Sequence, residues 1–226
     1  MIEQALHIEF DENQRVSALL DRPEHPIACF VFAHGAGAGM THSFMSGFAR
    51  ELAARNIACL RYQFPYMEAR SKRPDRPALA HATVRAAAAK AAMLFPDVRL
   101  IAGGKSFGGR MTSQAQAEQP LPHVRGLAFL GFPLHPASKP SRERADHLAK
   151  VKIPMLFLQG TKDTLAELDL LKPAVAALGK NATLKLIPES DHSFHVPART
   201  GRRDADILKE IADIFASWTR EVTHAA

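Results

Sequence analysis

Residues 101–110 read IAGGKSFGGR, and this stretch determines how the rest of the sequence is interpreted. An apolar strand is predicted just before it, at 98–102, and a helix is predicted directly after it. Between them, Gly104, Ser106 and Gly108 form the pattern G-x-S-x-G, which is typical of a nucleophile elbow. A serine in such a strained turn projects from the sheet only if glycines on either side let strand and helix pass closely. For the pentapeptide alone, a glycine-rich turn with an incidental serine is the alternative.

The rest of the chain favours a parallel α/β sheet, because short apolar segments alternate with longer amphipathic or alanine-rich segments. Most apolar segments are continuous, as expected of strands that helices cover on both faces. Strands are predicted at 27–33, 57–62, 98–102, 127–131, 154–158 and 184–187. Segments 5–10 and 16–20 are predicted to form a leading antiparallel pair, with a turn at Asp11, Glu12 and Asn13. The predicted fold class is therefore α/β, with a mostly parallel central sheet and helices on both faces.

Helices are predicted between these strands from capping residues and from apolar side chains at helical spacing. The first is expected to begin at a cap of Thr41 or Ser43 and to end at Asn56. An alanine-rich helix is predicted at 77–94. A last helix, after Asp204, carries a single apolar stripe that is expected to cover one face of the sheet.

The composition is that of a globular protein: 226 residues include 46% hydrophobic and 23% charged side chains, with a net charge of +6. A chain of this length is expected to form a single domain over residues 1–226. The longest wholly apolar stretch, 27–33, is far shorter than the roughly 20 residues of a membrane-spanning helix. The N-terminal residues lack the basic and apolar pattern of a signal peptide, so a cytoplasmic location is expected. Cys29 and Cys59 lie in apolar strands and are expected to be reduced packing residues.

Two glycine-rich segments raise the question of nucleotide binding, and both fail on spacing. A phosphate-binding P-loop that ends in Lys105 and Ser106 requires a glycine at position 99, which is Arg99. A dinucleotide fingerprint that starts at Gly35 requires a glycine at position 40, which is Met40. Nucleic-acid binding is not expected either, because the aromatic residues are not arrayed with the basic ones as a stacking platform.

The segment from His34 to Gly39 predicts the second wall of an acyl-transfer site. An oxyanion hole needs two backbone N–H donors, one after the nucleophile and one from the loop after an earlier strand. We expect Phe107 to supply the first donor and Ala36 the second, with Gly37 as the nearest alternative to Ala36. The residues expected to support these loops are His34, Gly35, Gly37, Gly104 and Gly108. A tight strand-to-helix turn without a ligand is the other interpretation.

Two residues complete the site in the chain order serine, acid, histidine. Asp163 and His192 each follow a different predicted strand, and open α/β sheets place their sites at such C-terminal strand ends. Asp163 is expected to orient His192, which in turn accepts the proton of Ser106 as general base. The alternatives are Asp169 and Glu167, which are expected inside the next helix, and His195, which lies further from the strand end.

The segments HGAGAGM, GGKSFGGR, FPLHPASKP, LQGTKD and SDHSF together resemble a known family. It is the capless α/β-hydrolase domain shared by bacterial dienelactone-hydrolase-like proteins and the hydrolase-like domain of the non-specific-lethal complex subunit 3 family. The resemblance implies the α/β-hydrolase fold, a triad of Ser106, Asp163 and His192, and an oxyanion hole at Ala36 and Phe107. Dienelactone hydrolase proper has a cysteine nucleophile, whereas this chain has a serine. Eukaryotic relatives act partly as scaffolds, so a non-catalytic interaction module is the alternative function.

The expected function is therefore that of a serine hydrolase that cleaves an ester or thioester without a metal or organic cofactor. Only 22 residues, 132–153, separate two predicted strands, which is too few for a lid domain and predicts an open site for a small or exposed substrate. Basic residues after three strands predict an electropositive mouth that favours an anionic substrate or partner. They are Arg70, Lys72, Arg73, Arg76, Lys139, Arg142, Arg144, Arg199, Arg202 and Arg203.

Overall fold

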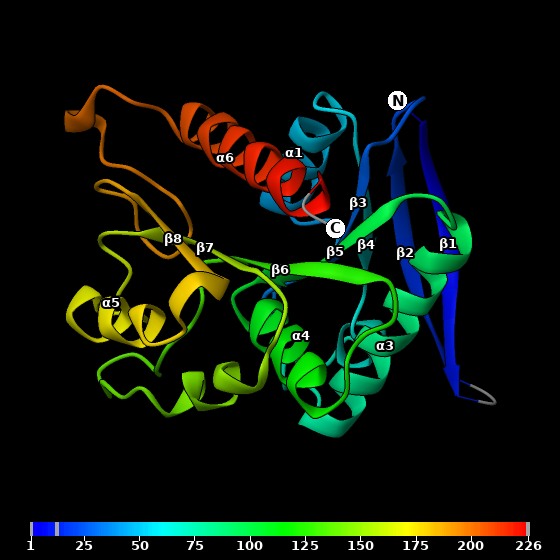
Figure 1. Ribbon diagram of the computed structural model, residues 1–226, viewed down its shortest axis with the longest axis horizontal. Helices are drawn as coiled ribbons and strands as arrows, with labels where there is room; N and C mark the ends of the chain where they lie inside the picture. The colour runs from blue at the N-terminus through cyan, green and yellow to red at the C-terminus, as the bar shows by residue number, and fades with distance from the viewer. Residues whose placement is uncertain (1, 12–13, 225–226) are drawn as a thin grey trace.

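The computed structural model describes residues 2–11 and 14–224, which form an eight-stranded sheet in the order β1-β2-β4-β3-β5-β6-β7-β8 (Figure 1). The strands are β1 (Ile2–Asp11), β2 (Gln14–Arg22), β3 (Ala28–Ala33), β4 (Ile57–Tyr62), β5 (Arg99–Lys105), β6 (Val124–Leu130), β7 (Met155–Gly160) and β8 (Ala182–Ile187). The pairs β1–β2 and β2–β4 are antiparallel, and the remaining pairs are parallel. The predicted mostly parallel sheet with a leading antiparallel pair is confirmed. Glu12 and Asn13 of the predicted turn lie outside the described residues.

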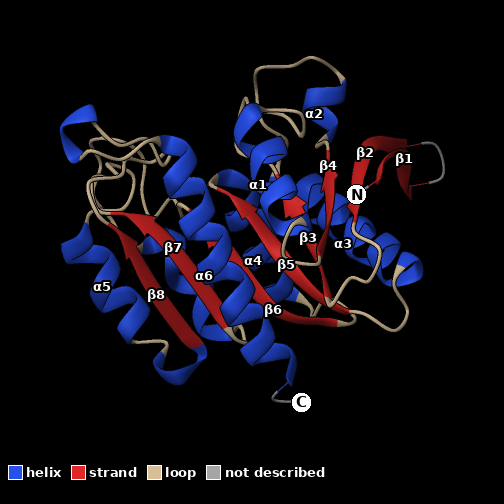
Figure 2. Cartoon of the chain, turned by 90° about the horizontal axis from the view of Figure 1, so that it is seen from above, coloured by secondary structure: helices blue, strands red, loops and turns tan. Residues whose placement is uncertain are grey.

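Helices cover both faces of the sheet, as predicted. They are α1 (Ser43–Ala53), α2 (Pro65–Glu68), α3 (Pro77–Leu94), α4 (Phe107–Glu118), α5 (Leu168–Ala176) and α6 (Asp204–His224), with short 3-10 helices η1 (Glu143–Lys150), η2 (Gly179–Asn181) and η3 (Ala198–Thr200). Apolar residues of α1 and α6 pack on one face, and those of α3, α4 and α5 pack on the other (Figures 1 and 2).

Side chains of the central strands alternate between these two apolar layers, because successive residues of a strand point to opposite faces. In β3, the Phe30 ring lies against Phe48 of α1 and Phe215 of α6. Cys29, its neighbour in sequence, belongs to the opposite layer. Cys29 and Cys59 are both free and buried, in different layers, so they act as packing residues.

Most strand boundaries differ from the predicted ones by one to three residues, and two differences have a clear physical reason. β5 continues through two glycines to Lys105, because β3 and β6 supply hydrogen-bonding partners on both sides of it. Helix α1 is capped by His42, whose ring nitrogen accepts a hydrogen bond from the main chain two residues later. The predicted caps Thr41 and Ser43 are therefore wrong, since an imidazole acceptor replaces the hydroxyl that capping patterns favour.

A buried arginine joins the antiparallel hairpin to the segment that follows β3. The Arg61 guanidinium, in β4, pairs with Asp21 of β2 at 2.8 Å and with Glu3 of β1 at 2.6 Å. It also donates to the Met40 carbonyl oxygen at 3.1 Å and to Ser46 Oγ at 2.9 Å. Because the arginine side chain is only 1% exposed, these partners replace the water that it loses on folding.

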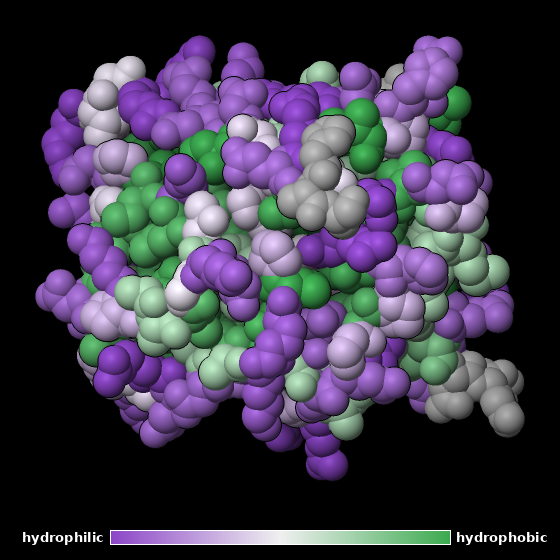
Figure 3. Space-filling view, viewed as in Figure 1, coloured by the Kyte–Doolittle hydropathy of each residue, from purple (hydrophilic) through white to green (hydrophobic). Residues whose placement is uncertain are grey.

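The connection from β6 to β7 contains only the short helix η1, so the part of the chain that the structure describes has no lid domain. This agrees with the short segment 132–153 that separates the two strands. None of the described helices is both long and apolar enough to span a bilayer. In Figure 3, hydrophilic side chains cover much of the visible face, and hydrophobic side chains show between them.

Candidate active site

Ser106 lies in a strained turn between β5 and α4. Its φ of 50° and ψ of −117° fall outside the regions that non-glycine residues favour. The neighbouring strand β3 requires the flanking glycines: a Cβ at Gly104 would lie 2.4 Å from the Ala33 carbonyl oxygen, and a Cβ at Gly108 would lie 2.6 Å from the same atom. The turn therefore has the close approach of strand and helix that the sequence pattern predicts.

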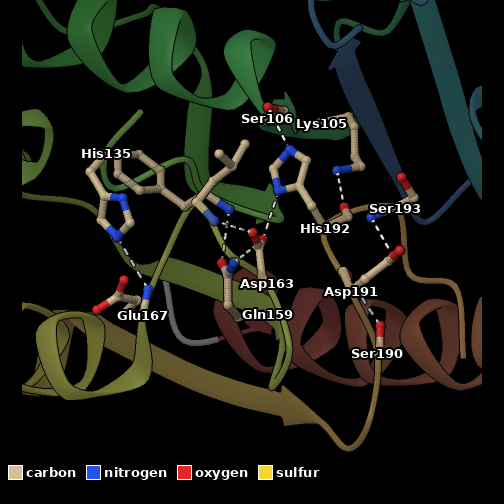
Figure 4. Close-up of polar contacts among 12 residues, drawn as sticks. Lys105, Ser106, His135, Gln159, Asp163, Glu167, Ser190, Asp191, His192 and Ser193 are labelled. Atoms are coloured by element: carbon tan, nitrogen blue, oxygen red, sulfur yellow. Dashed lines mark hydrogen bonds and ion pairs between the residues drawn. The ribbon is translucent and has the colours of Figure 1, made fainter. Parts of the chain in front are cut away.

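Ser106, His192 and Asp163 come from three different strand ends and are joined by hydrogen bonds (Figure 4). Ser106 Oγ lies 2.8 Å from His192 Nε2, and His192 Nδ1 lies 2.7 Å from Asp163 Oδ2. Because Nδ1–H donates a hydrogen bond to the carboxylate, Nε2 is unprotonated and can accept the serine proton. The Asp163 side chain is 0% exposed and the imidazole is 24% exposed, so the ring connects a buried negative charge to the serine hydroxyl.

Two groups that the sequence patterns did not indicate hold the Asp163 carboxylate. Gln159 Nε2 donates to Asp163 Oδ2 at 2.5 Å, and the Leu165 N–H donates to Oδ1 at 2.8 Å. Gln159 is fixed in turn, because its Oε1 accepts from the Phe132 N–H at 2.9 Å. These bonds satisfy the buried carboxylate and orient it toward His192. The sequence signal for Gln159 is a polar residue at the end of an otherwise apolar strand.

The loop after β3 is braced by the loop after β4. His34 Nδ1 donates to the Gly35 carbonyl oxygen at 2.8 Å, and His34 Nε2 accepts from the Phe64 N–H at 3.0 Å. Burial lowers the pKa of the His34 imidazole to about 4, so the ring is neutral at pH 7 and Nε2 remains an acceptor. The Gly37 N–H donates to Tyr66 Oη at 3.1 Å, a bond that no sequence pattern predicts.

The two predicted oxyanion donors lie close to Ser106, one directly after it in the chain and one in the wall of the same cavity. Ala36 lines the cavity beside the serine, whereas the N–H of its alternative, Gly37, is occupied by Tyr66. Phe107 is the first residue of α4, and the N–H groups of a first helical turn have no acceptor within the helix. The dipole of α4 also favours negative charge at this point. The geometry thus favours Ala36 over Gly37 as the partner of Phe107.

A cavity of about 340 Å³ opens in front of Ser106. Its wall is partly apolar, with the side chains of Phe44, Met45 and Leu165, and it includes the ring of His192. Lys105 is the one lysine or arginine among the described residues of this wall, and its Nζ donates to the His192 carbonyl oxygen at 2.5 Å. The sequence patterns treated Lys105 as the variable position before the serine and as the lysine of a P-loop that fails on spacing.

The ten basic residues that predict an electropositive mouth are placed differently from Lys105. They follow β4, β6 and β8, and none of them lines the cavity described above. Three of them are paired with carboxylates: Arg199 with Glu189, Arg202 with Glu210, and Arg203 with Asp206. The positive charge in the cavity wall is therefore Lys105 rather than one of the loop arginines.

The alternative acid and base residues lie in other environments. The His195 side chain is 62% exposed and pairs with Asp204 at 2.9 Å. Asp169 is exposed in the first turn of α5, as expected. Glu167 precedes that helix as its N-cap residue, so its expected place inside the helix is wrong. His192 is bonded to Asp163 and not to either of these acids.

Comparisons with known proteins agree with this architecture. A family model described as an alpha/beta hydrolase domain matches residues 26–220. A putative carboxymethylenebutenolidase from Methylorubrum extorquens is 31% identical over 155 residues, which are 66% of this chain and 53% of that protein. The matched part thus spans about half the length of that relative.

Solved structures share the fold at low sequence identity. Dienelactone hydrolase from Anabaena variabilis has a TM-score of 0.79, with 20% identity over 98% of each chain. The esterase domain of a Rhodothermus marinus protein has a TM-score of 0.75, with 16% identity over 98% of this chain and 99% of that one. A serine hydrolase without a lid from Xanthomonas campestris has a TM-score of 0.70, with 20% identity over 96% of this chain and 94% of that one. The chain belongs to the alpha/beta hydrolase domain family and has the capless, dienelactone-hydrolase-like form of its fold.

Proposed function

We propose that the chain is a serine hydrolase that cleaves a carboxylic ester or thioester through an acyl-enzyme on Ser106. The observation that carries this proposal is the unbroken chain of hydrogen bonds from Ser106 Oγ through His192 to the buried Asp163 carboxylate. The Ser106 hydroxyl lies at a strained turn that faces a cavity. A hydroxyl placed in this way becomes a nucleophile when the imidazole removes its proton.

The first half of the reaction acylates the serine. As Ser106 Oγ attacks the substrate carbonyl carbon, its proton passes to His192 Nε2, and Asp163 stabilises the imidazolium through Nδ1–H. The carbonyl oxygen becomes an oxyanion, and the N–H groups of Ala36 and Phe107 are the proposed donors to it. The tetrahedral intermediate then collapses, the bond to the leaving group breaks, and that group takes the proton from His192 Nε2.

The second half of the reaction returns the free enzyme. A water molecule gives a proton to His192 Nε2 and attacks the acyl carbon, which forms a second oxyanion in the same position. Collapse of this intermediate releases the carboxylic acid, and Ser106 Oγ regains its proton from the imidazole. No net charge or proton remains on the protein after one turnover.

The open cavity favours a small ester or an ester group that projects from a larger molecule. About 340 Å³ holds a short acyl chain, and the apolar wall at Phe44, Met45 and Leu165 suits a hydrocarbon group. The basic residues in the loops after β4, β6 and β8 support a preference for an anionic substrate through their long-range field. Affinity for a carboxylated ester and its neutral analogue at low and high salt tests this preference. Equal affinities at both salt concentrations would contradict it.

The function is tested by labelling with a fluorophosphonate, followed by intact mass measurement of the wild type and of Ser106→Ala. We expect one adduct on the wild type and none on the variant. A positive result leads to a panel of short esters, thioesters and lactones, the last chosen because dienelactone hydrolase shares the fold. A folded wild-type protein that gains no adduct would contradict the proposal and favour the interaction module.

A further inference from the structure

Lys105 connects the turn that carries Ser106 to the loop that carries His192 (Figure 4). Its Nζ donates to the main-chain carbonyl oxygen of His192 at 2.5 Å. Because Lys105 directly precedes Ser106, two adjacent residues bond the same histidine, one at its carbonyl and one at its ring. The position of His192 relative to Ser106 is therefore restrained both at its main chain, by Lys105, and at its ring, by Ser106.

Gly131 leaves space for the ammonium, and two aromatic rings lie beside it. Gly131 has a φ of 69°, and a Cβ there would lie 3.0 Å from Lys105 Nζ and 3.4 Å from His192 Nδ1. On another side, Nζ lies 5.5 Å from the ring centroid of Phe194 and 5.9 Å from that of Phe44. Aromatic faces at this distance attract a cation. The two rings are stacked with centroids 5.6 Å apart, so they form one wall.

Other bonds fix the rest of the His192 loop and leave its carbonyl oxygen to Lys105. The Asp191 carboxylate accepts from the Ser193 N–H at 2.7 Å and from the His195 N–H at 2.9 Å. The Asp191 N–H donates to the His195 carbonyl oxygen at 3.0 Å. Within the described residues, the hydrogen bond to the His192 carbonyl oxygen comes from Lys105.

The Lys105 ammonium lies in surroundings that lower its pKa. Burial lowers the pKa of Lys105 from 10.5 to about 8, although the carboxylates of Asp163 and Asp191 raise it. The titratable groups around the ammonium are these two carboxylates, the His192 imidazole, and His42 in the wall of the same cavity. Since the unfolded chain binds the lysine proton more tightly than the folded chain, the charged form destabilises the fold. A titratable group with a shifted pKa beside the serine is a candidate for a functional role.

We propose that Lys105 is a positioning residue, whose ammonium holds the His192 main chain so that the imidazole stays within hydrogen-bonding distance of Ser106. The inference rests on the proposed function, in which His192 is the general base. Lys105 does not transfer a proton to the substrate in this role, and it acts only through His192.

The test compares Lys105→Met, Lys105→Arg and a matched control, Lys162→Met. Lys162 lies on the Asp163 loop, but its side chain is 60% exposed and is directed to Glu189. The measurements are the second-order rate of labelling by an uncharged fluorophosphonate, and kcat and KM for p-nitrophenyl acetate. Lys105→Met should lose up to about 10²-fold in labelling rate and in kcat, because a misplaced base slows proton transfer. KM should stay unchanged, since Nζ binds the protein main chain and the ester is uncharged.

The two other variants separate positioning from packing. Lys105→Arg keeps a charged N–H donor and should recover most of the wild-type rate, and Lys162→Met should keep all of it. The labelling rate of the wild type should fall above about pH 8, where the ammonium loses its proton and its charge-assisted bond weakens. That fall should be absent in Lys105→Arg, because a guanidinium does not titrate in this range. The Tm of Lys105→Met should equal or exceed that of the wild type.

The outcomes separate this inference from the proposed function. If the wild type is labelled at Ser106 and Lys105→Met has the same rate and pH profile, the inference is overturned and the function stands. If Lys105→Met has a lower Tm and Lys105→Arg keeps the alkaline fall, the role is structural and the inference is also overturned. If the wild type is not labelled, the function and the inference fail together.

Discussion

Two serine–histidine pairs lie along α4, one at its start and one in its interior. Ser106 precedes the helix and bonds His192 Nε2 at 2.8 Å. Ser113 lies seven positions further along and bonds His147 Nε2 at 2.7 Å. Each histidine lines a cavity, of about 340 Å³ at His192 and about 330 Å³ at His147. The distance between serine and histidine and the size of the cavity are thus nearly the same in the two places.

The surroundings of the two pairs differ. Ser113 Oγ donates to the Arg110 carbonyl oxygen at 2.9 Å, so its proton is already engaged and His147 Nε2–H is the donor between the two side chains. Burial, Arg110 and His81 lower the pKa of His147 to about 4. Among the described residues, no carboxylate is hydrogen bonded to the His147 ring, and Ser113 lies inside a helix whose N–H groups are occupied. A serine beside a histidine therefore needs the strained turn, the buried carboxylate and free N–H donors before it can serve as a nucleophile.

Removal of each hydroxyl gives the largest expected contrast between the two pairs. Ser106→Ala should reduce turnover by about 10⁶-fold, as the loss of the nucleophile does in known serine hydrolases. Ser113→Ala should keep wild-type turnover, because this hydroxyl does not reach the cavity at Ser106. The measurement is kcat/KM on a short ester, with circular dichroism to verify folding. A large loss in Ser113→Ala with an intact fold would break the comparison.

The carboxylate behind His192 should account for the next largest effect. Asp163→Asn should lower kcat on the order of 10⁴-fold, because an amide no longer fixes the tautomer with a proton on Nδ1. The matched control is Asp169→Asn, the same substitution at an exposed position in the first turn of α5, which should be silent. Similar rates for the two variants would show that the buried carboxylate does not distinguish the pairs.

The two histidines with lowered pKa should make the fold sensitive to acid. His34 and His147 each have a pKa of about 4 in the folded chain, below the ordinary value of 6.5. The unfolded chain therefore binds more protons between these values, and stability falls as the pH drops from about 6.5 to 4. For the fully buried His34 the full difference corresponds to roughly 3 kcal/mol.

His147 is partly exposed, so its contribution to this acid sensitivity is smaller. Urea unfolding at pH 7 and pH 4.5 measures the loss, which should be reduced in His147→Gln and unchanged in the exposed control His25→Gln. Equal losses of stability at pH 4.5 in the wild type and in His147→Gln would show that burial does not keep the His147 imidazole neutral.

The smallest expected effect is on stability alone. Ser113→Ala leaves the His147 Nε2–H without its acceptor, which should lower the free energy of unfolding by about 1–3 kcal/mol. Ser217→Ala, on the exposed side of α6, is the control and should change stability little. An unchanged free energy of unfolding in Ser113→Ala would contradict this prediction, because it would mean that water accepts the His147 Nε2–H bond equally well.

Sequence patterns predicted the elements better than their ends. The alanine-rich helix at 77–94 matches α3 residue for residue, because its proline start and alanine content are local signals. The strand predicted at 98–102 is longer in the structure, since β5 extends through Gly103 and Gly104 to Lys105. Glycine is a poor strand former, and its place in a strand depends on neighbours that only the assembled sheet provides.

The same limit applies to the site. Strand ends were enough to predict that Ser106, Asp163 and His192 come together, and the structure brings them together. The contacts that hold them depend on which strands are neighbours, and this order is not local in sequence. For that reason Gln159 behind the carboxylate and Lys105 at the His192 carbonyl were not predicted. Both are polar residues at the ends of apolar strands, which is the pattern to look for.

The bond between His34 and the loop after β4 has a consequence for the energetics of turnover. The imidazole and the Tyr66 hydroxyl fix the chain on both sides of Ala36 before any substrate arrives. A donor that is already ordered loses little entropy when charge develops on the substrate, so the entropy of activation should be small. The ordering took place when the sheet folded, so in the proposed reaction the aromatic residues after β4 would affect the rate through the loop that they brace.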